Sequence, residues 1–154
     1  MKSPEERLRE MGIELPGAPA PLGSYVPAAR SGDLLFLSGI LPLRDGKLGR
    51  AGKVGRDLTP EEARDEARQA AINALAVVKA HAGSLDKVAR CVKLTGFVAS
   101  APDFTGQPSV LNSASDLLAE VFGEAGRHAR VAVGVASLPL DAAVEIEFVF
   151  QLRG

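Results

Sequence analysis

A segment of small apolar residues in the middle of the chain constrains the fold most. Between Thr59 and Ala82, apolar residues recur at the spacing of one helix face. The segment begins with Thr59-Pro60-Glu61-Glu62, which combines a capping box with a proline at the first helical position. Because alanine lets a helix axis lie close to its neighbour, we expect this helix to pack tightly against a sheet. The stripe consists of Ala63, Ala67, Ala70, Ala71, Ala74 and Val78.

The rest of the chain alternates between strand-like and helical patterns. Strands are indicated by β-branched residues or by alternation of apolar and polar side chains. A second helix is predicted from Pro108 to Gly123, where apolar residues again keep helical spacing. The order of two strands, helix, strand, helix and two strands predicts an α+β fold with a single mixed sheet and two helices on one face. The predicted strands cover residues 25–26, 34–38, 88–100, 130–136 and 143–152.

Residues 1–22 are predicted to be an N-terminal helix and proline-rich arm attached to a domain that spans residues 23–154. Ser3-Pro4-Glu5-Glu6 repeats the helix-start pattern, and a glycine soon ends the helix. The segment from Leu15 to Leu22 contains three prolines, which fix φ and remove hydrogen-bond donors, so we expect an extended connector. The glycine-rich segment from Asp45 to Gly55 is expected to be flexible and exposed.

Charge and reactive side chains argue against several classes of function. Eighteen basic and nineteen acidic residues give a formal net charge of −1, so no overall field attracts nucleic acid or anionic lipid. The single cysteine, Cys91, cannot form a disulfide within the chain, and with only two histidines a Cys/His zinc site lacks ligands. No signal-peptide pattern or membrane-length apolar stretch occurs. We therefore expect no metal, nucleic acid or membrane partner, a cytoplasmic location, and an inert core thiol at Cys91.

An acidic pair and an arginine are the strongest candidates for chemistry. Glu145 and Glu147 lie on one face of the last predicted strand, because side chains alternate along a strand. If the last two strands pair through a turn within residues 137–142, Arg130 lies on the same ribbon. Its guanidinium could then hold a small carboxylate with two parallel hydrogen bonds. The alternatives are a solvated sheet face for the glutamates and an ion pair with one of them for Arg130.

Several short motifs follow one another between residues 20 and 152. The most specific is the spacing from Ala129-Arg130 through Leu138-Pro139 to Val144-Glu145-Ile146-Glu147. This pattern resembles the Rid family of reactive-intermediate deaminases, which is also described as YjgF-like or endoribonuclease L-PSP. The other matching positions are Gly23-Ser24-Tyr25-Val26, Ser38-Gly39-Ile40-Leu41-Pro42, Asn112 and Asp141.

The resemblance implies a chorismate-mutase-like protomer, a homotrimer and three clefts between subunits. It also implies cofactor-free hydrolysis of enamine and imine acids, such as 2-aminoacrylate and its imine tautomer, to a 2-oxo acid and ammonia. Arg130 would clamp the substrate carboxylate, and Glu145 would orient the attacking water and help to deprotonate it. Tyr25, Asn112 and the backbone of Gly39 would complete the cleft. Resemblance to a longer subgroup of the family, which has an N-terminal arm, adds His128 as a further polar group of the cleft.

Three departures from the better-studied members leave the substrate open. Those members carry a cysteine at the position of Ala132, a proline at Ser24 and a glutamine at Ile40. One alternative is a non-catalytic trimer that binds a small carboxylate or acts through protein contacts. Another is a ribonuclease, suggested by the family's older label, but neutral charge and few aromatic residues argue against an RNA groove.

Overall fold

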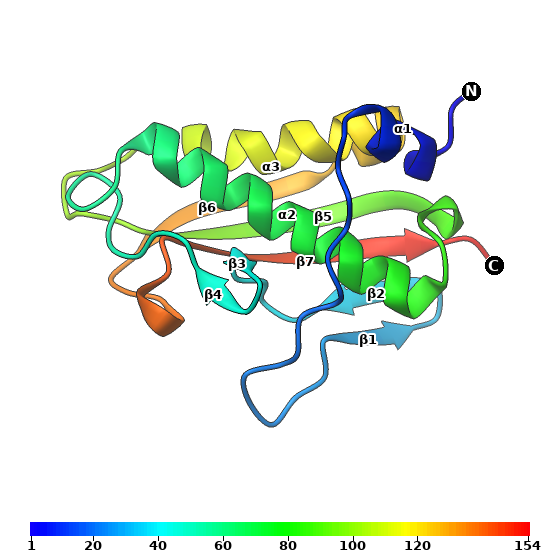
Figure 1. The fold of residues 1–154 in the computed structure, drawn as a ribbon, viewed down its shortest axis with the longest axis horizontal. Coiled ribbons are helices and arrows are strands. Elements are labelled where there is room, and N and C mark those ends of the chain that lie inside the picture. The colour runs from blue at the N-terminus through cyan, green and yellow to red at the C-terminus, as the bar shows by residue number, and fades with distance from the viewer.

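Two long helices lie side by side on one face of a five-stranded sheet in the computed structural model, which describes residues 1–154 (Figure 1). Helix α2 spans Pro60–Ala82 and α3 spans Gln107–Phe122. The strand order is β1-β2-β7-β5-β6, antiparallel except for the parallel β5-β6 pair. The predicted α+β fold with a mixed sheet and two helices on one face is confirmed. The strands are β1 Ala28–Ser31, β2 Leu34–Leu37, β5 Val88–Ala99, β6 Ala129–Val135 and β7 Val144–Leu152.

Helix α2 begins and packs as its sequence predicts. Thr59 caps the helix and forms a reciprocal capping box with Glu62, and Gly83 ends it at a φ of 88°. Five alanines on its inner side have no exposed surface, so the helix backbone lies close to the sheet. They are Ala63, Ala67, Ala70, Ala71 and Ala74.

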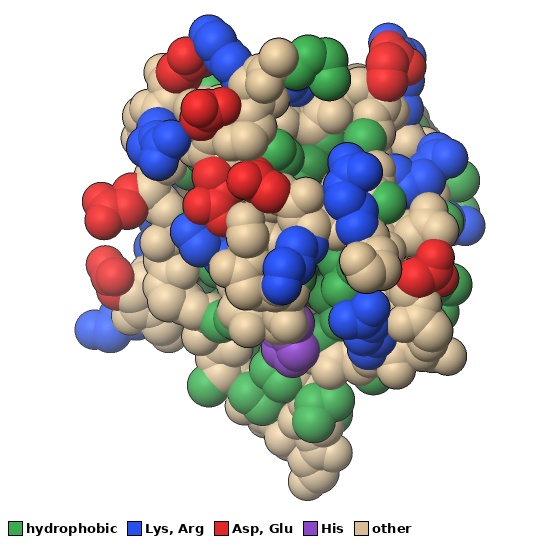
Figure 2. Space-filling view, turned by 90° about the vertical axis from the view of Figure 1, so that its right-hand side faces the viewer, with side chains coloured by type: hydrophobic (Ala, Val, Ile, Leu, Met, Phe, Trp, Pro, Cys, Tyr) green, Lys and Arg blue, Asp and Glu red, His purple; other side chains and the backbone are tan.

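The N-terminal arm is attached to the outer side of α2. Helix α1, Pro4–Glu10, has the capping box predicted at Ser3, and its Leu8 joins the hydrophobic core. Beyond Gly12 the chain crosses α2 and then projects as a loop before β1 (Figure 1). Hydrophobic side chains gather near the base of the projection in Figure 2, and Leu22 and Val26 of this loop are 58% and 59% exposed.

Two local predictions are wrong. Tyr25–Val26 is not a strand: Tyr25 lies in a bend and Val26 in no regular element. Strand β1 begins at Ala28, and the hairpin turn occupies only Gly32-Asp33. The glycine-rich segment is not uniformly exposed, since Val54 is fully buried and its amide donates to the carbonyl of Ala99. The first part of the segment forms a short hairpin, in which β4, Lys47–Leu48, pairs with β3, Leu43–Arg44.

The hypothesis that the last two strands pair is also wrong. Strand β5 lies between them, parallel to β6 on one edge and antiparallel to β7 on the other. The alternation of side chains tells which face a residue occupies, but it does not tell which edge a strand pairs. The connection crosses β5 through a turn in which Leu140 and Asp141 have φ values of 60° and 61°, a conformation uncommon for residues other than glycine.

The face of the sheet opposite the helices is uncovered in the protomer. Phe36, Val131 and Val133 on this face are 45%, 41% and 39% exposed. Their strand partners, such as Val149 opposite Phe36, continue the apolar surface.

Elsewhere on the surface, acidic and basic side chains are interspersed, as Figure 2 shows for the end of the molecule that carries both termini. No helix combines the length and the apolar character needed to span a membrane.

Candidate active site

Glu145 lies on the uncovered side of β7, directly beside Gly39. The flanking residues Val144 and Ile146 are buried under the helices, so alternation turns Glu145 to the other face. Ile40 bridges to Ile146 with two backbone hydrogen bonds, which bring Gly39 next to the glutamate. A Cβ at position 39 would lie 2.7 Å from Glu145 Oε2 and 2.9 Å from its Cδ. The carboxyl can therefore occupy this place only because residue 39 is a glycine.

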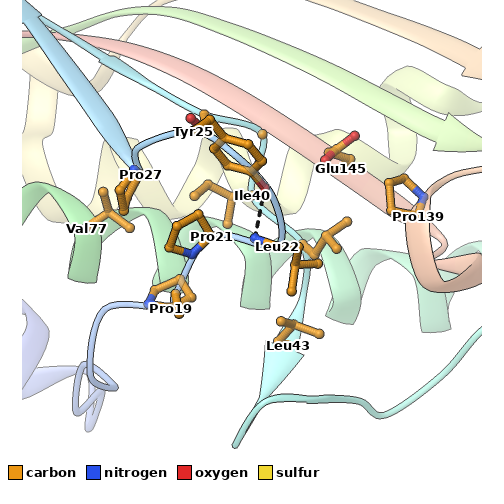
Figure 3. A pocket seen from close by; sticks show the side chains of 14 residues that line it. Pro19, Pro21, Leu22, Tyr25, Pro27, Ile40, Leu43, Val77, Pro139 and Glu145 are labelled. Atoms are coloured by element: carbon orange, nitrogen blue, oxygen red, sulfur yellow. Dashed lines mark hydrogen bonds between the residues drawn. The ribbon is translucent and has the colours of Figure 1, made fainter.

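A cavity of about 250 Å³ opens beside Glu145 (Figure 3). Tyr25 and Glu145 line one side of it, while residues of the arm line the other. The Leu22 amide donates a 3.2 Å hydrogen bond to the Tyr25 hydroxyl oxygen, drawn as the dashed line in Figure 3. The hydroxyl hydrogen of Tyr25 is therefore still available to donate to a ligand.

The Glu145 carboxyl has no hydrogen-bond or ion-pair partner within the protomer, although the residue is half-buried. Burial raises its pKa above the usual value, and the neighbouring charge of Glu147 raises the pKa further. Such a carboxyl can exchange a proton closer to neutral pH than an exposed one. An unpaired carboxyl with a raised pKa in a cavity is a candidate for acid-base chemistry.

Arg130 belongs to a second cluster, on the helix side of the sheet. Its register partner in β5 is the buried Leu94, so its side chain points toward α3. Nη1 donates to Asn112 Oδ1 at 2.9 Å and to Ser115 Oγ at 3.2 Å, and Nη2 donates to the Pro108 carbonyl at 3.4 Å. A guanidinium has five N–H donors, so donors on Nε and Nη2 remain for a ligand.

His128 supports Arg130 through a serine. Its Nδ1 lies 2.7 Å from the Gly126 carbonyl oxygen, which can only accept, so Nδ1 carries the proton. In the neutral ring Nε2 then accepts from the Ser115 hydroxyl at 2.9 Å, while Ser115 Oγ accepts from Arg130. Burial lowers the pKa of His128, and the positive charge of Arg130 lowers it as well. The neutral form required by this chain of hydrogen bonds is therefore favoured.

The sequence-predicted site residues form two groups within one protomer. Glu145, Tyr25 and Gly39 line the cavity, whereas Arg130, Asn112 and His128 gather beside α3. Arg130 forms no ion pair with Glu145 or Glu147. The ribbon that was expected to carry Arg130 and Glu145 together does not exist, because β5 separates their strands and the two side chains lie on opposite faces.

Neither a metal site nor a thiol nucleophile is apparent among the described residues. No group of three or more His, Cys, Asp and Glu side chains is arranged to hold a metal ion. Cys91 is buried, as expected, and burial raises the pKa of its thiol to about 12, so the reactive thiolate is strongly disfavoured.

A family model described as "YjgF/chorismate_mutase-like, putative endoribonuclease" matches residues 5–152. The chain belongs to this family. Protein TCP17 of Trypanosoma cruzi is 47% identical over 147 residues, which cover 95% of this chain and 92% of the relative. The 2-iminobutanoate/2-iminopropanoate deaminase of Dermatophagoides farinae is 35% identical over 141 residues, which cover 92% of this chain and 95% of the relative.

A solved structure shows the same fold. The crystal structure of protein Atu1372, of unknown function, from Agrobacterium tumefaciens superposes with a TM-score of 0.90 at 49% sequence identity. The match covers 97% of this chain and 92% of that one. The predicted Rid-family membership and chorismate-mutase-like fold are confirmed, and relatives within the YjgF-like family are named as deaminases.

Two features of this YjgF-like site were missed from the sequence. Ser115, which the sequence predictions do not include, links His128 to Arg130. Its spacing of three from Asn112 places both on one face of α3 and was a usable signal. The arm is predicted only to be an extended connector, but Pro19, Pro21 and Leu22 line the cavity. No pattern in the arm itself indicates where an extended connector will pack.

Proposed function

We propose that this YjgF-like protein hydrolyses 2-imino acids and their enamine tautomers to 2-oxo acids and ammonia, without a cofactor, in clefts between the subunits of a homotrimer. The proposal depends chiefly on one observation: the unpaired Glu145 carboxyl and the free donors of Arg130 lie on opposite faces of one sheet. Each is half of a site that a neighbouring subunit can complete. The name of the 35% identical relative from Dermatophagoides farinae supports the imine chemistry.

Arg130 would bind the substrate carboxylate. Its Nη1 is held by Asn112 and Ser115, which leaves donors on Nε and Nη2 for two roughly parallel hydrogen bonds to a carboxylate. A charge-assisted hydrogen bond contributes about 1.5 to 3 kcal/mol, which is enough to select acids over neutral imines.

Glu145 of the adjacent subunit would act as the general base and the general acid. As a carboxylate it would take a proton from a water that attacks the carbon of the protonated imine, forming a C–O bond and a 2-amino-2-hydroxy acid. The same carboxyl would return that proton to the nitrogen. As a carboxylate again, it would take the hydroxyl proton while the C–N bond breaks, so that ammonia leaves and the 2-oxo acid forms; the proton then passes to solvent. The hydroxyl of Tyr25 would donate a hydrogen bond to the intermediate. General acid-base help of this kind is typically worth about 10² to 10⁴ in rate.

The uncovered sheet face supports assembly. Phe36, Val131 and Val133 form an exposed apolar surface on the side of the sheet that also carries Glu145. Burial of such a surface against copies of the same chain would remove apolar area from water and bring the two half-sites together.

The test measures imine hydrolysis directly. An amino-acid oxidase generates the 2-imino acid in the presence of semicarbazide, and the protein competes by hydrolysing the imine before it is trapped. We expect the wild-type protein to suppress semicarbazone formation and Arg130→Ala to lose most of this effect. Arg127→Ala, a nearby exposed arginine that pairs with Glu124, is the matched control and should behave as wild type.

Two outcomes would contradict the proposal. If the wild-type protein did not accelerate imine hydrolysis, the result would favour the non-catalytic hypothesis, in which the cleft binds a small carboxylate without turnover. Full activity of Arg130→Ala would remove the carboxylate clamp from the mechanism.

A further inference from the structure

The cavity beside Glu145 is larger and more apolar than a three-carbon imino acid requires. Its volume of about 250 Å³ is the volume that about eight water molecules occupy in liquid water. Glu145 is its only charged lining residue. Apolar side chains form most of the remaining wall, among them Pro19, Pro21, Leu22, Ile40, Leu43 and Val77.

The polar and apolar parts of this cavity are separated in space. Tyr25 and Glu145 lie along one side in Figure 3, and the arm prolines with Leu22 and Leu43 lie along the other. A substrate whose reacting carbon is next to Glu145 would therefore extend its side chain toward the arm. A substrate whose side chain is only a methyl group would leave most of this apolar space to water.

The arm is held in place by contacts that do not need a ligand. The Leu22 amide donates to the Tyr25 hydroxyl, and α1, at the start of the arm, is fixed because Glu5 accepts hydrogen bonds from the Leu85 amide and the Ser84 hydroxyl. Asn73 of α2 fixes the opposite wall through hydrogen bonds to two backbone carbonyls beside the cavity. The apolar cavity is therefore formed by contacts within the chain, without a ligand.

We infer that the arm and the wall at Ile40 form a subsite for the substrate side chain, and that the preferred substrates are 2-imino acids with branched or extended apolar side chains, such as those formed from leucine or methionine. The inference rests on the proposed function. Each methylene buried in such a site is worth roughly a fourfold gain in binding. The leucine-derived imine should therefore be preferred over the alanine-derived imine by roughly 10- to 100-fold in kcat/KM.

Two exposed side chains of the same loop provide a matched pair of variants. Leu22 lines the cavity and Val26 does not, yet their exposures are nearly equal at 58% and 59%. Leu22→Ser should lower the ratio of kcat/KM for the leucine-derived over the alanine-derived imine by roughly tenfold. Val26→Ser should leave this ratio unchanged. Because the measurement is a ratio, a partial loss of folded protein cancels.

Binding of the product 2-oxo acids separates this inference from the catalytic proposal. Calorimetry with 4-methyl-2-oxopentanoate and pyruvate should show tighter binding of the branched acid and loss of that preference in Leu22→Ser. Such a preference without imine hydrolysis would support the subsite and refute the catalysis. Equal binding and turnover of both sizes, or an equal shift in both serine variants, would overturn the subsite.

Discussion

A single methyl group at Gly39 should impair the reaction without unfolding the protein. In Gly39→Ala the added carbon would lie 2.7 Å from Glu145 Oε2, whereas ordinary contacts begin at 3.4 Å, so the carboxyl must retreat by roughly 0.7 Å. Misplacement of a reacting group by about 1 Å can cost on the order of 100-fold. We therefore expect kcat/KM to fall roughly 10- to 100-fold, which is about 1.4 to 2.7 kcal/mol in the barrier.

The semicarbazide competition assay measures this loss, and thermal unfolding checks the fold. Gly17→Ala is the matched control, because a Cβ at that position meets nothing within 4 Å. It should keep wild-type activity. Full activity of Gly39→Ala, or a loss of activity that merely follows a loss of folded protein, would refute the argument that Glu145 acts from the position it occupies beside Gly39.

Three further predictions concern charge and support around the site. Glu147→Gln removes a charge that raises the pKa of Glu145, so the acidic limb of the pH profile of kcat/KM should move to lower pH; an unmoved limb would contradict the assignment. The pKa of His128 is lowered in the folded protein, so the unfolded state binds more protons and the free energy of unfolding should fall as pH drops below about 6.5. In urea titrations, the free energy of unfolding of His128→Gln should depend less on pH than that of the wild type. An identical dependence would contradict the role given to His128. Asn73→Ala leaves two backbone carbonyls beside the cavity without their donor and should cost about 1 to 3 kcal/mol of stability in the same titrations, whereas no loss would contradict this role.

The local elements could be predicted because their signals are local. The capping boxes at Ser3 and Thr59 begin helices where expected, and the alanine stripe lies against the sheet. Alternation along β7 correctly placed Glu145 on the face away from Ile146. These features depend on spacing within one segment, which a single sequence contains.

The pairing of strands and the partition of the site could not be predicted in the same way. The choice of edge for β6 depends on contacts between segments far apart in the sequence, and it places β5 between the strands that carry Arg130 and Glu145. The path of the arm from Pro19 to Leu22 is likewise set by α2 and Tyr25 rather than by its own residues. The sequence names candidate residues for the site, but only the structure shows how they group.

Activity in mixed oligomers tests the central claim most directly. Arg130→Ala and Glu145→Gln should each be nearly inactive alone. When both chains are co-expressed in equal amounts in a cyclic assembly, about one quarter of the clefts should combine an intact Glu145 with an intact Arg130 from the neighbour. We predict about one quarter of wild-type activity in the mixture. No activity above that of the single variants, with an active wild type and confirmed mixing of subunits, would contradict a site shared between subunits.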